Sequence, residues 1–325
     1  MRSLCIAFAC LAAIGSVGAG EDRRPEIAAR VELHPLLSRT LSDAEFLRGE
    51  REAGRPVTVA GEFRIAQGQR RLPVVVMIHG SSGVGPNIEP WTQLLNAMGV
   101  STFVIDGFTG RGLTGTGADQ ALLGRLNLVL DGYRTLDVLA KHPRVDPSRI
   151  VLMGFSRGGQ AALFAAMDRL DRMWNGSGIR YAAHIPFYPD CSTSYLSDTE
   201  ISAPIRVFHG TPDDYNPVAS CRAYLGRLKD AGRDVALTEY PNAQHGFDSP
   251  LMQEGPSVAT RSQTVRRCTI RETQPGVLTN ADTSAPFSYQ DACVERDPHV
   301  GGDLAATQAA RDAVAQYLKA TLRLP

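Results

Sequence analysis

The sequence Gly-Phe-Ser-Arg-Gly at 154–158 places a serine between two glycines, each two residues away from it. A mainly apolar run (149–153) precedes it and an alanine-rich stretch (159–170) follows, so we expect a buried strand to turn directly into a helix at Ser156. In such a turn, a side chain at either glycine position collides with a neighbouring element. The turn exposes the Ser156 hydroxyl at the carboxyl end of a sheet and aims the Arg157 backbone N–H at anionic oxygen.

A serine hydroxyl becomes a strong nucleophile only when a base takes its proton, so this turn implies a histidine and an acid that orients the histidine. Along the chain the expected order is serine, aspartate, histidine. Only His245 and His299 follow the Asp213–Asp214 pair, and His245 comes soon after an apolar strand pattern at 235–240. We therefore predict His245 as the base and Asp213 as the acid, with His299 and Asp214 as the alternatives.

A second loop of small residues, His-Gly-Ser-Ser-Gly at 79–83, also follows an apolar strand pattern. Its small side chains allow the backbone to approach a bound group. The backbone N–H of Ser81 is therefore the predicted partner of the Arg157 N–H in an oxyanion hole. A plain tight turn is the alternative interpretation, and His79 fits a residue that braces this loop better than it fits a catalyst.

These residues can meet only if several strands end at the same edge of one sheet. Continuous apolar runs such as 73–78 are typical of parallel strands that are covered on both faces. Their alternation with helical patterns predicts an α/β fold with a doubly wound, mostly parallel sheet. Strands are expected at 57–65 (one or two antiparallel edge strands), 73–78, 102–105, 149–153, 181–188, 205–208 and 235–240. Helices are expected from the capping box at 42–45 onwards and at 91–98, 118–140, 159–170, 218–231 and 305–322.

Two segments without clear periodicity are expected to shape a binding site. The loop 106–117 contains five glycines, and Arg111 within it is a candidate for binding a substrate carboxylate, with a structural arginine as the alternative. The segment 249–302 is too long for a simple connection, which predicts a lid or an elaborated loop. After a signal peptide at 1–20 we expect a single domain (21–325), made up of a core (55–248), this insertion (249–302) and a closing helix (303–322).

The charges of the chain are balanced, with 34 Lys plus Arg against 34 Asp plus Glu, which argues against a nucleic-acid partner. Residues 1–20 have the pattern of a secretory signal, with Arg2 before an apolar stretch (4–17) that is too short to span a bilayer. A lipoprotein signal that ends at Cys10 is the alternative. We therefore predict an exported chain, periplasmic or secreted, without a membrane span after cleavage.

Four cysteines follow the signal segment, and an even number in an exported protein favours disulfides. Of the three possible pairings we predict Cys191 with Cys221 and Cys268 with Cys293, because each of these bonds closes a local loop. Four free thiols are the alternative. The sequence has no Cys-x-x-Cys spacing, which argues against a zinc site.

These motifs together resemble those of the dienelactone hydrolase family of α/β-hydrolases, over about residues 55–248 and again in the last helix. The stretches that carry the resemblance are HGSSG at 79–83, GFSRGG at 154–159, HGTPDDYNP at 209–217 and NAQHGF at 242–247. The chain is similar to exported members of the family in TLSDAEFLRGE at 40–50, DGFTGRG at 106–112 and FSYQDACVERDPHVG at 287–301.

The resemblance implies an α/β-hydrolase fold, a triad of Ser156, Asp213 and His245, and a bond between Cys191 and Cys221. The founding enzymes of the family carry a cysteine nucleophile and a glutamate near the oxyanion loop, where this chain has Ser156 and the HGSSG loop.

The predicted reaction is the hydrolysis of a small carboxylic ester or lactone through an acyl-enzyme, with no metal and no organic cofactor. The alternatives are a peptidase or acyltransferase with the same triad, and a non-catalytic binding protein on the same scaffold.

Overall fold

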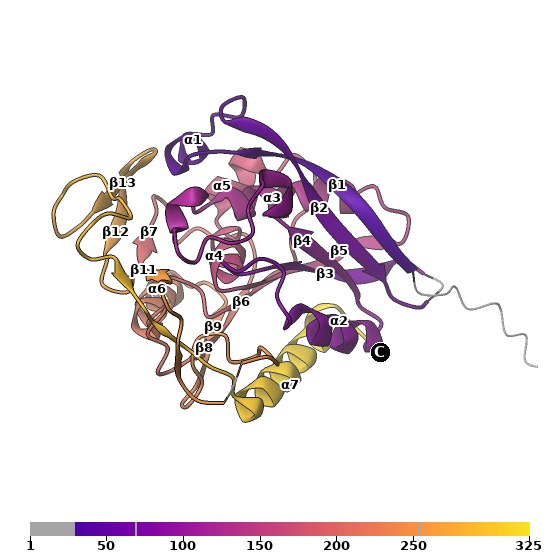
Figure 1. Cartoon of the computed structure of the whole chain (residues 1–325). Helices are drawn as coiled ribbons and strands as arrows, with labels where there is room; N and C mark the ends of the chain where they lie inside the picture. The colour runs from indigo at the N-terminus through magenta and orange to yellow at the C-terminus, as the bar shows by residue number, and fades with distance from the viewer. Residues whose placement is uncertain (1–29, 69, 253) are drawn as a thin grey trace, which may run out of the picture.

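The computed structural model describes residues 30–68, 70–252 and 254–325. An eight-stranded sheet forms its centre, with the strands in the spatial order β1-β2-β4-β3-β5-β6-β8-β9 (Figure 1). The pairs β1–β2 and β2–β4 are antiparallel, and the remaining pairs are parallel. The strands of this sheet are β1 (Arg30–Thr40), β2 (Arg55–Ile65), β3 (Leu72–Ile78), β4 (Ser101–Asp106), β5 (Val145–Phe155), β6 (Ala183–Phe187), β8 (Ile205–Gly210) and β9 (Val235–Tyr240). This arrangement confirms the predicted doubly wound α/β sheet.

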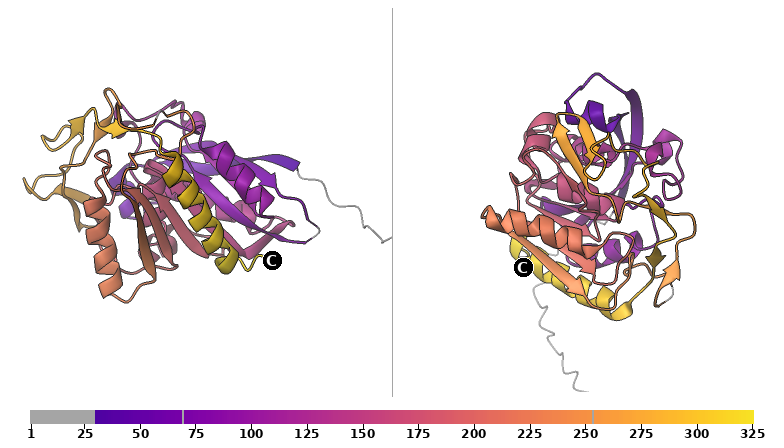
Figure 2. Two further views of the ribbon diagram at one scale, coloured as in Figure 1. Left: turned by 90° about the horizontal axis from the view of Figure 1, so that it is seen from below. Right: turned by 90° about the vertical axis from the view of Figure 1, so that its left-hand side faces the viewer.

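Helices cover both faces of the sheet, with α3, α4 and α5 on one face and α2 and α7 on the other (Figures 1 and 2). The α-helices are α1 (Asp43–Leu47), α2 (Ile88–Ala97), α3 (Asn127–Leu139), α4 (Arg157–Phe164), α5 (Asp168–Trp174), α6 (Val218–Asp230) and α7 (Leu304–Thr321). Two short 3-10 helices are η1 (Thr109–Arg111) and η2 (Gln120–Leu122). Along β3, Val74 and Val76 join the core on the first face, whereas Val75 and Met77 join the core on the second. The run is apolar throughout because successive side chains of a strand point to opposite faces.

Strand β1 departs from the usual side-chain pattern, because Leu36 is buried in the core but most of its other apolar side chains face solvent. The apolar side chains of Val31, Leu33 and Leu37 are exposed to solvent, and Ser38 is buried and donates a hydrogen bond to Asp131. The strand pairs with β2 over its whole length, from Arg30↔Ile65 to Thr40↔Arg55. Backbone pairing, the buried side chain of Leu36 and the hydrogen bond of Ser38 therefore hold a strand that alternation in the sequence does not predict.

Two expected helices differ in the structure. The helix expected at 118–140 begins only at Asn127, and Gln120–Leu122 form the 3-10 helix η2 before it. At Gly124 the backbone passes close to Leu41, whose backbone oxygen would lie 2.6 Å from a Cβ at this position. The stretch expected as one helix at 159–170 is divided into α4 and α5, which meet where Met167 forms a bridge with Ile201. Both changes come from contacts with distant residues rather than from helix propensity.

The segment 249–302 is not irregular throughout. It contains short strands that pair with one another and, through β12, with β7 (Thr193–Ser194). These strands are β10 (Ser257–Val258), β11 (Gln263–Thr264), β12 (Ile270–Gln274), β13 (Val277–Asn280), β14 (Glu295–Arg296) and β15 (His299–Val300). Figure 1 shows much of the segment in orange beyond β7 and α6, at one side of the main sheet. Most of its strands are two residues long, which is too short for periodicity in the sequence to reveal them.

Two disulfides join Cys191 to Cys221 and Cys268 to Cys293, which are the two local pairs favoured by the sequence. The first connects the chain after β6 with α6, and the second closes a loop within the segment 249–302. The predicted signal segment 1–20 lies outside the described residues. Within the described ranges, no helix combines the length and the apolar character that crossing a membrane requires.

Replacing both Cys268 and Cys293 by alanine should lower the free energy of unfolding by about 3 kcal/mol. The bond joins residues 25 positions apart, and a crosslink over a loop of this size restricts the unfolded chain by roughly that amount. Urea unfolding of the double variant and of the wild type, both without reductant, measures the difference. Equal unfolding midpoints would show that this bond contributes nothing to stability.

Candidate active site

The turn between β5 and α4 holds Ser156 in a strained backbone conformation, with a φ of 55° and a ψ of −114°. A Cβ at Gly154 would lie 2.0 Å from the backbone oxygen of Gly158, and a Cβ at Gly158 would lie 2.1 Å from that of Ile78. Both positions therefore require glycine. The Ser156 N–H donates to the backbone oxygen of Phe187 at the end of β6, at 3.0 Å. The strain and these contacts hold the hydroxyl at the carboxyl edge of the sheet.

Three side chains from separate loops meet at this edge. The Nε2 atom of His245 lies 2.8 Å from Ser156 Oγ, and its Nδ1 atom lies 2.9 Å from Asp213 Oδ2. Asp213 is 3% exposed, and its other oxygen accepts hydrogen bonds from the N–H groups of Tyr215 and Asn216. Because an ionised carboxylate only accepts, Nδ1 of His245 carries the proton and Nε2 is free to accept from the serine hydroxyl.

Asp214, the neighbouring candidate acid, points away from His245. Its carboxylate accepts from the backbone N–H of His299 at 2.7 Å, lies 2.9 Å from His299 Nδ1, and pairs with Arg266 at 2.8 Å. Asp214 therefore attaches the segment 249–302 to the loop after β8. His299 belongs to the same attachment and is not placed to take a proton from Ser156.

The pKa of Asp214 predicts how this attachment depends on pH. Partial burial alone raises the pKa of its carboxyl group, but hydrogen bonds from His299 and the charge of Arg266 outweigh burial and lower it. A carboxyl whose folded pKa is depressed stabilises the fold above its unfolded value of about 4, and this contribution disappears as the pH falls through the folded value. Asp214→Asn should lower Tm at pH 7, and the difference from wild type should shrink below about pH 4. Thermal unfolding at several pH values tests this, and a constant difference would contradict it.

The loop 79–83 lies beside the serine. A Cβ at Gly80 would lie 3.3 Å from the Cβ of Ser156, so the backbone of the loop approaches the hydroxyl closely. The backbone oxygen of Ser81 accepts from Thr116 N–H at 2.8 Å. His79 is buried, its Nε2 accepts from the N–H of Gly107 at 3.1 Å, and its ring packs against Phe108. His79 therefore braces this loop and takes no direct part in the site.

Arg111 does not reach the site, which corrects its assignment as a substrate-binding candidate. Its guanidinium forms a bidentate ion pair with Asp131 at 2.6 and 2.9 Å, and its side chain is 1% exposed. The remaining donors reach the backbone oxygens of Gly107 and Arg39 and the hydroxyl of Thr40. With all of its donors used inside the protein, Arg111 joins β1 to α3 as a structural residue.

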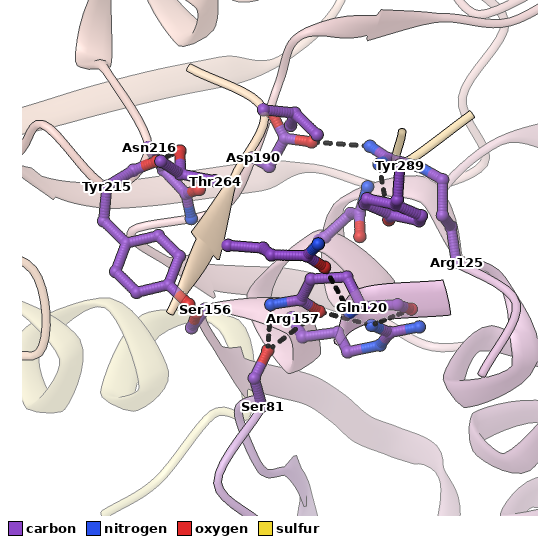
Figure 3. Close-up of a pocket in the computed structure, with 13 residues that line it drawn as sticks. Ser81, Gln120, Arg125, Ser156, Arg157, Asp190, Tyr215, Asn216, Thr264 and Tyr289 are labelled. Atoms are coloured by element: carbon purple, nitrogen blue, oxygen red, sulfur yellow. Dashed lines mark hydrogen bonds and ion pairs between the residues drawn. The ribbon is translucent and has the colours of Figure 1, made fainter. Parts of the chain in front are cut away.

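Two cavities share Ser156 and Ser81 in their walls, and Figure 3 shows the residues that line the first of them. The first, of about 40 Å³, is called the polar cavity here, because its wall includes the side chains of Gln120, Arg125, Arg157 and Gln160. The second, of about 220 Å³, is called the apolar cavity, and its wall includes Pro86, Phe155, Tyr188, Met252 and Val300. His245 lines the apolar cavity.

Several residues of the site have no signal in the sequence. Gln120 accepts a hydrogen bond from the Arg157 guanidinium at 2.6 Å and donates to Ser81 Oγ at 3.2 Å. Tyr215 is the exception, because it lies two residues after Asp213 in the loop that follows β8. Its ring stacks on that of His245 with the centroids 4.5 Å apart.

The segment 249–302 contacts the loops that carry Gln120, Tyr215 and His245. Val300 forms a bridge with His245, and the N–H of Gly301 donates to the backbone oxygen of His245. The Thr264 hydroxyl donates to the backbone oxygen of Tyr215, and the Gln263 side chain accepts from the N–H of Gln120 at 2.8 Å. Through these contacts the segment supports the loops of the site.

The order of the strands and the glycine-flanked serine after β5 define an α/β-hydrolase fold. Residues 60–268 match the sequence model of the dienelactone hydrolase family, and the chain belongs to that family. The chain is therefore a carboxylic ester hydrolase, and the predicted resemblance is confirmed.

Solved structures show the same fold. A dienelactone hydrolase-like promiscuous phosphotriesterase from metagenomic libraries is 16% identical, with a TM-score of 0.55, and the alignment covers 90% of this chain and 98% of that one. A structure designated m3DLH is 18% identical, with a TM-score of 0.56 and the same two coverages. At these identities the similarity concerns the fold alone.

Proposed function

We propose that this chain hydrolyses carboxylic esters or lactones through an acyl-enzyme on Ser156, with His245 as the base and Asp213 as the acid that orients it. The observation that carries the proposal is the continuous chain of contacts from Asp213 to His245 and on to Ser156, at 2.9 and 2.8 Å. A hydroxyl, an imidazole and a carboxylate in this order are the groups that serine acyl transfer requires.

In the proposed first step, His245 Nε2 takes the proton of Ser156 Oγ while the oxygen attacks the ester carbonyl. The backbone N–H groups of Ser81 and Arg157 stabilise the negative oxygen that forms. His245 then gives the proton to the oxygen of the leaving alcohol, and the acyl group stays on Ser156. Water attacks the acyl-enzyme by the same path and releases the acid.

A fluorophosphonate probe tests the nucleophile directly. The wild type should be labelled with a stoichiometry of about one, and Ser156→Ala should neither be labelled nor hydrolyse p-nitrophenyl acetate above background. Ser82→Ala, a change in the adjacent loop, is the matched control and should keep the labelling. Labelling that persists in Ser156→Ala would overturn the assignment.

We further infer that the chain is exported and that its part after residue 20 forms one domain. The two disulfides support export, because such bonds persist in oxidising compartments. The contacts of the segment 249–302 with His245 and Tyr215 support a single domain. Cell fractionation of a tagged full-length chain, together with the mass of its mature N-terminus, tests the predicted cut after residue 20.

A further inference from the structure

Two aromatic rings contact the imidazole of His245. The ring of Tyr215 is stacked on it, with the centroids 4.5 Å apart and an angle of 26° between the planes. The ring of Tyr188 meets it in a T-shaped contact, with the centroids 4.8 Å apart and an angle of 64°. His245 is 5% exposed, so the proposed base takes up its proton against aromatic rings and largely out of water.

The loop after β8 fixes the position of the Tyr215 ring. The backbone N–H of Tyr215 donates to Asp213 Oδ1 at 2.9 Å, and its backbone oxygen accepts from the hydroxyl of Thr264. The residue is 8% exposed and lines both cavities, and Figure 3 shows its phenol ring extending toward Ser156. One short loop therefore places the carboxylate at Nδ1 of the imidazole and an aromatic ring on its face.

A stacked ring interacts differently with the neutral and the protonated imidazole. The face of an aromatic ring carries the negative part of its quadrupole, and it attracts a cation that lies within about 6 Å of the centroid. This attraction is larger where water is excluded, because little solvent screens it. In the proposed mechanism His245 is an imidazolium after it has taken the proton of Ser156. The Tyr215 ring therefore favours the form of His245 that arises during the reaction.

Most titratable groups next to His245 are neutral. Asp213 supplies the negative charge in direct contact, at 2.9 Å. The Nδ1 atom of His209 lies 3.8 Å from Asp213 Oδ2, but burial lowers the pKa of His209, so its ring is neutral at pH 7. Burial raises the pKa of both Tyr188 and Tyr215, so neither phenol is ionised there. The stacked ring acts on His245 through its quadrupole and not through a net charge.

The other charged groups nearby have partners of their own. Asp248 accepts hydrogen bonds from the Tyr188 hydroxyl at 2.5 Å and from the indole of Trp91 at 2.7 Å. The guanidinium of Arg157 lies in the wall of the polar cavity, and the carboxylate of Asp214 points away from His245. These charges stay in place when the ring at position 215 is changed, so they do not mask its effect.

We propose that Tyr215 is a positioning residue for His245, whose ring face holds the imidazole in line with Ser156 and stabilises the imidazolium. The inference rests on the proposed function, because it uses His245 as the base. The ring is required and its hydroxyl is not, so phenylalanine should serve at this position. Because the ring favours the protonated base, its removal should let the enzyme stay active at lower pH while its maximal rate falls.

The dependence of kcat/KM on pH tests this role. For p-nitrophenyl acetate, kcat/KM should fall on acidification between about pH 8 and 4.5, and the midpoint of this fall reports the free enzyme. Tyr215→Leu should move the midpoint to lower pH by about 0.5 to 1 unit and lower the maximal kcat by about 3- to 10-fold. Tyr215→Phe, the matched control that keeps the ring, should leave the midpoint within about 0.2 unit of wild type.

A series of fluorinated rings separates the quadrupole from the packing. Phenylalanine analogues with one, two and three ring fluorines, incorporated in place of Tyr215, keep nearly the same shape while the negative charge of the ring face decreases. The midpoint should move to lower pH with each added fluorine, toward the value of Tyr215→Leu. A ring that only fills space would give one midpoint throughout. The series also decides the question if Tyr215→Leu fails to fold, which circular dichroism detects.

The outcomes distinguish the role of Tyr215 from the proposed function. Equal midpoints across the fluorinated series, in enzymes that still hydrolyse the ester, overturn the role and leave the proposed function standing. Because Tyr215 lines both cavities, p-nitrophenyl butyrate is measured as well, and a shift seen with only one of the two esters also overturns the role. A wild type that hydrolyses neither ester overturns the proposed function, and this inference with it.

Discussion

Replacement of His245 by alanine should lower kcat for p-nitrophenyl acetate by about five to six orders of magnitude while the fold stays intact. Among the described residues, His245 is the group that hydrogen-bonds to Ser156 Oγ, and loss of a triad base in other serine hydrolases has effects of this size. Steady-state kinetics and circular dichroism measure the two quantities.

His299→Ala is the matched control for this experiment. His299 lies within hydrogen-bonding distance of Asp214 and forms no hydrogen bond with Ser156. Its removal should therefore leave kcat within about tenfold of wild type. A His245→Ala variant that keeps its activity within tenfold would show that another group is the base. A His299→Ala variant with the larger loss would reverse the assignment.

Replacement of Asp213 by asparagine should lower kcat by about four orders of magnitude. The asparagine amide can donate an N–H to His245 Nδ1, which favours the tautomer with the proton on Nε2, and Nε2 then no longer accepts from Ser156. KM should change much less, because Asp213 is buried behind His245 and lines neither cavity.

Asp214→Asn provides the comparison at the adjacent position. Its carboxylate attaches His299 and Arg266, and its loss should lower kcat by no more than about tenfold. Equal losses of kcat in the two asparagine variants would show that Asp213 and Asp214 contribute only by stabilising the loop after β8. A larger loss in Asp214→Asn would make that residue the acid.

Much of the fold is predictable because local sequence patterns determine it. The apolar run before Ser156 and its two glycines predict the strand-to-helix turn, since close backbone contacts exclude any other residue at 154 and 158. The capping box that starts at Ser42 is present in α1, because its hydrogen bonds are made within four residues. The alternation of apolar runs with helices predicts the parallel sheet for the same reason.

The remaining features depend on contacts between distant parts of the chain. Strand β1 has three apolar side chains exposed and only Leu36 in the core, so its place depends on pairing with β2 more than on its own pattern. Arg111 lies in a glycine-rich loop that suggested a binding role, but Asp131 of α3 pairs with it and keeps it from the cavities. Neither β2 as the partner of β1 nor Asp131 as the partner of Arg111 can be identified without knowing which elements pack together.

The residues of the polar cavity also depend on contacts between distant parts of the chain. Gln120 precedes α3, Gln160 lies within α4, and Tyr289 comes from the segment 249–302. Their side chains meet only after the sheet and this segment have assembled. The roles of Ser156, Asp213 and His245 were predicted because each follows a strand pattern in the expected order, and these roles stay predictions until the variants are measured.

The contacts of the segment 249–302 restrict how substrate preference can evolve in this chain. Gln263 and Val300 form part of the cavity walls and also hold the loops of Gln120 and His245. A substitution at either position that admits a new substrate should also loosen the groups proposed to be catalytic, so we expect a wider substrate range there to come with a lower rate. Met252 and Ala259 also line the apolar cavity, and among the described residues neither forms a hydrogen bond with the loops of Gln120 or His245. We expect natural variation in substrate range among related sequences to concentrate at these two positions.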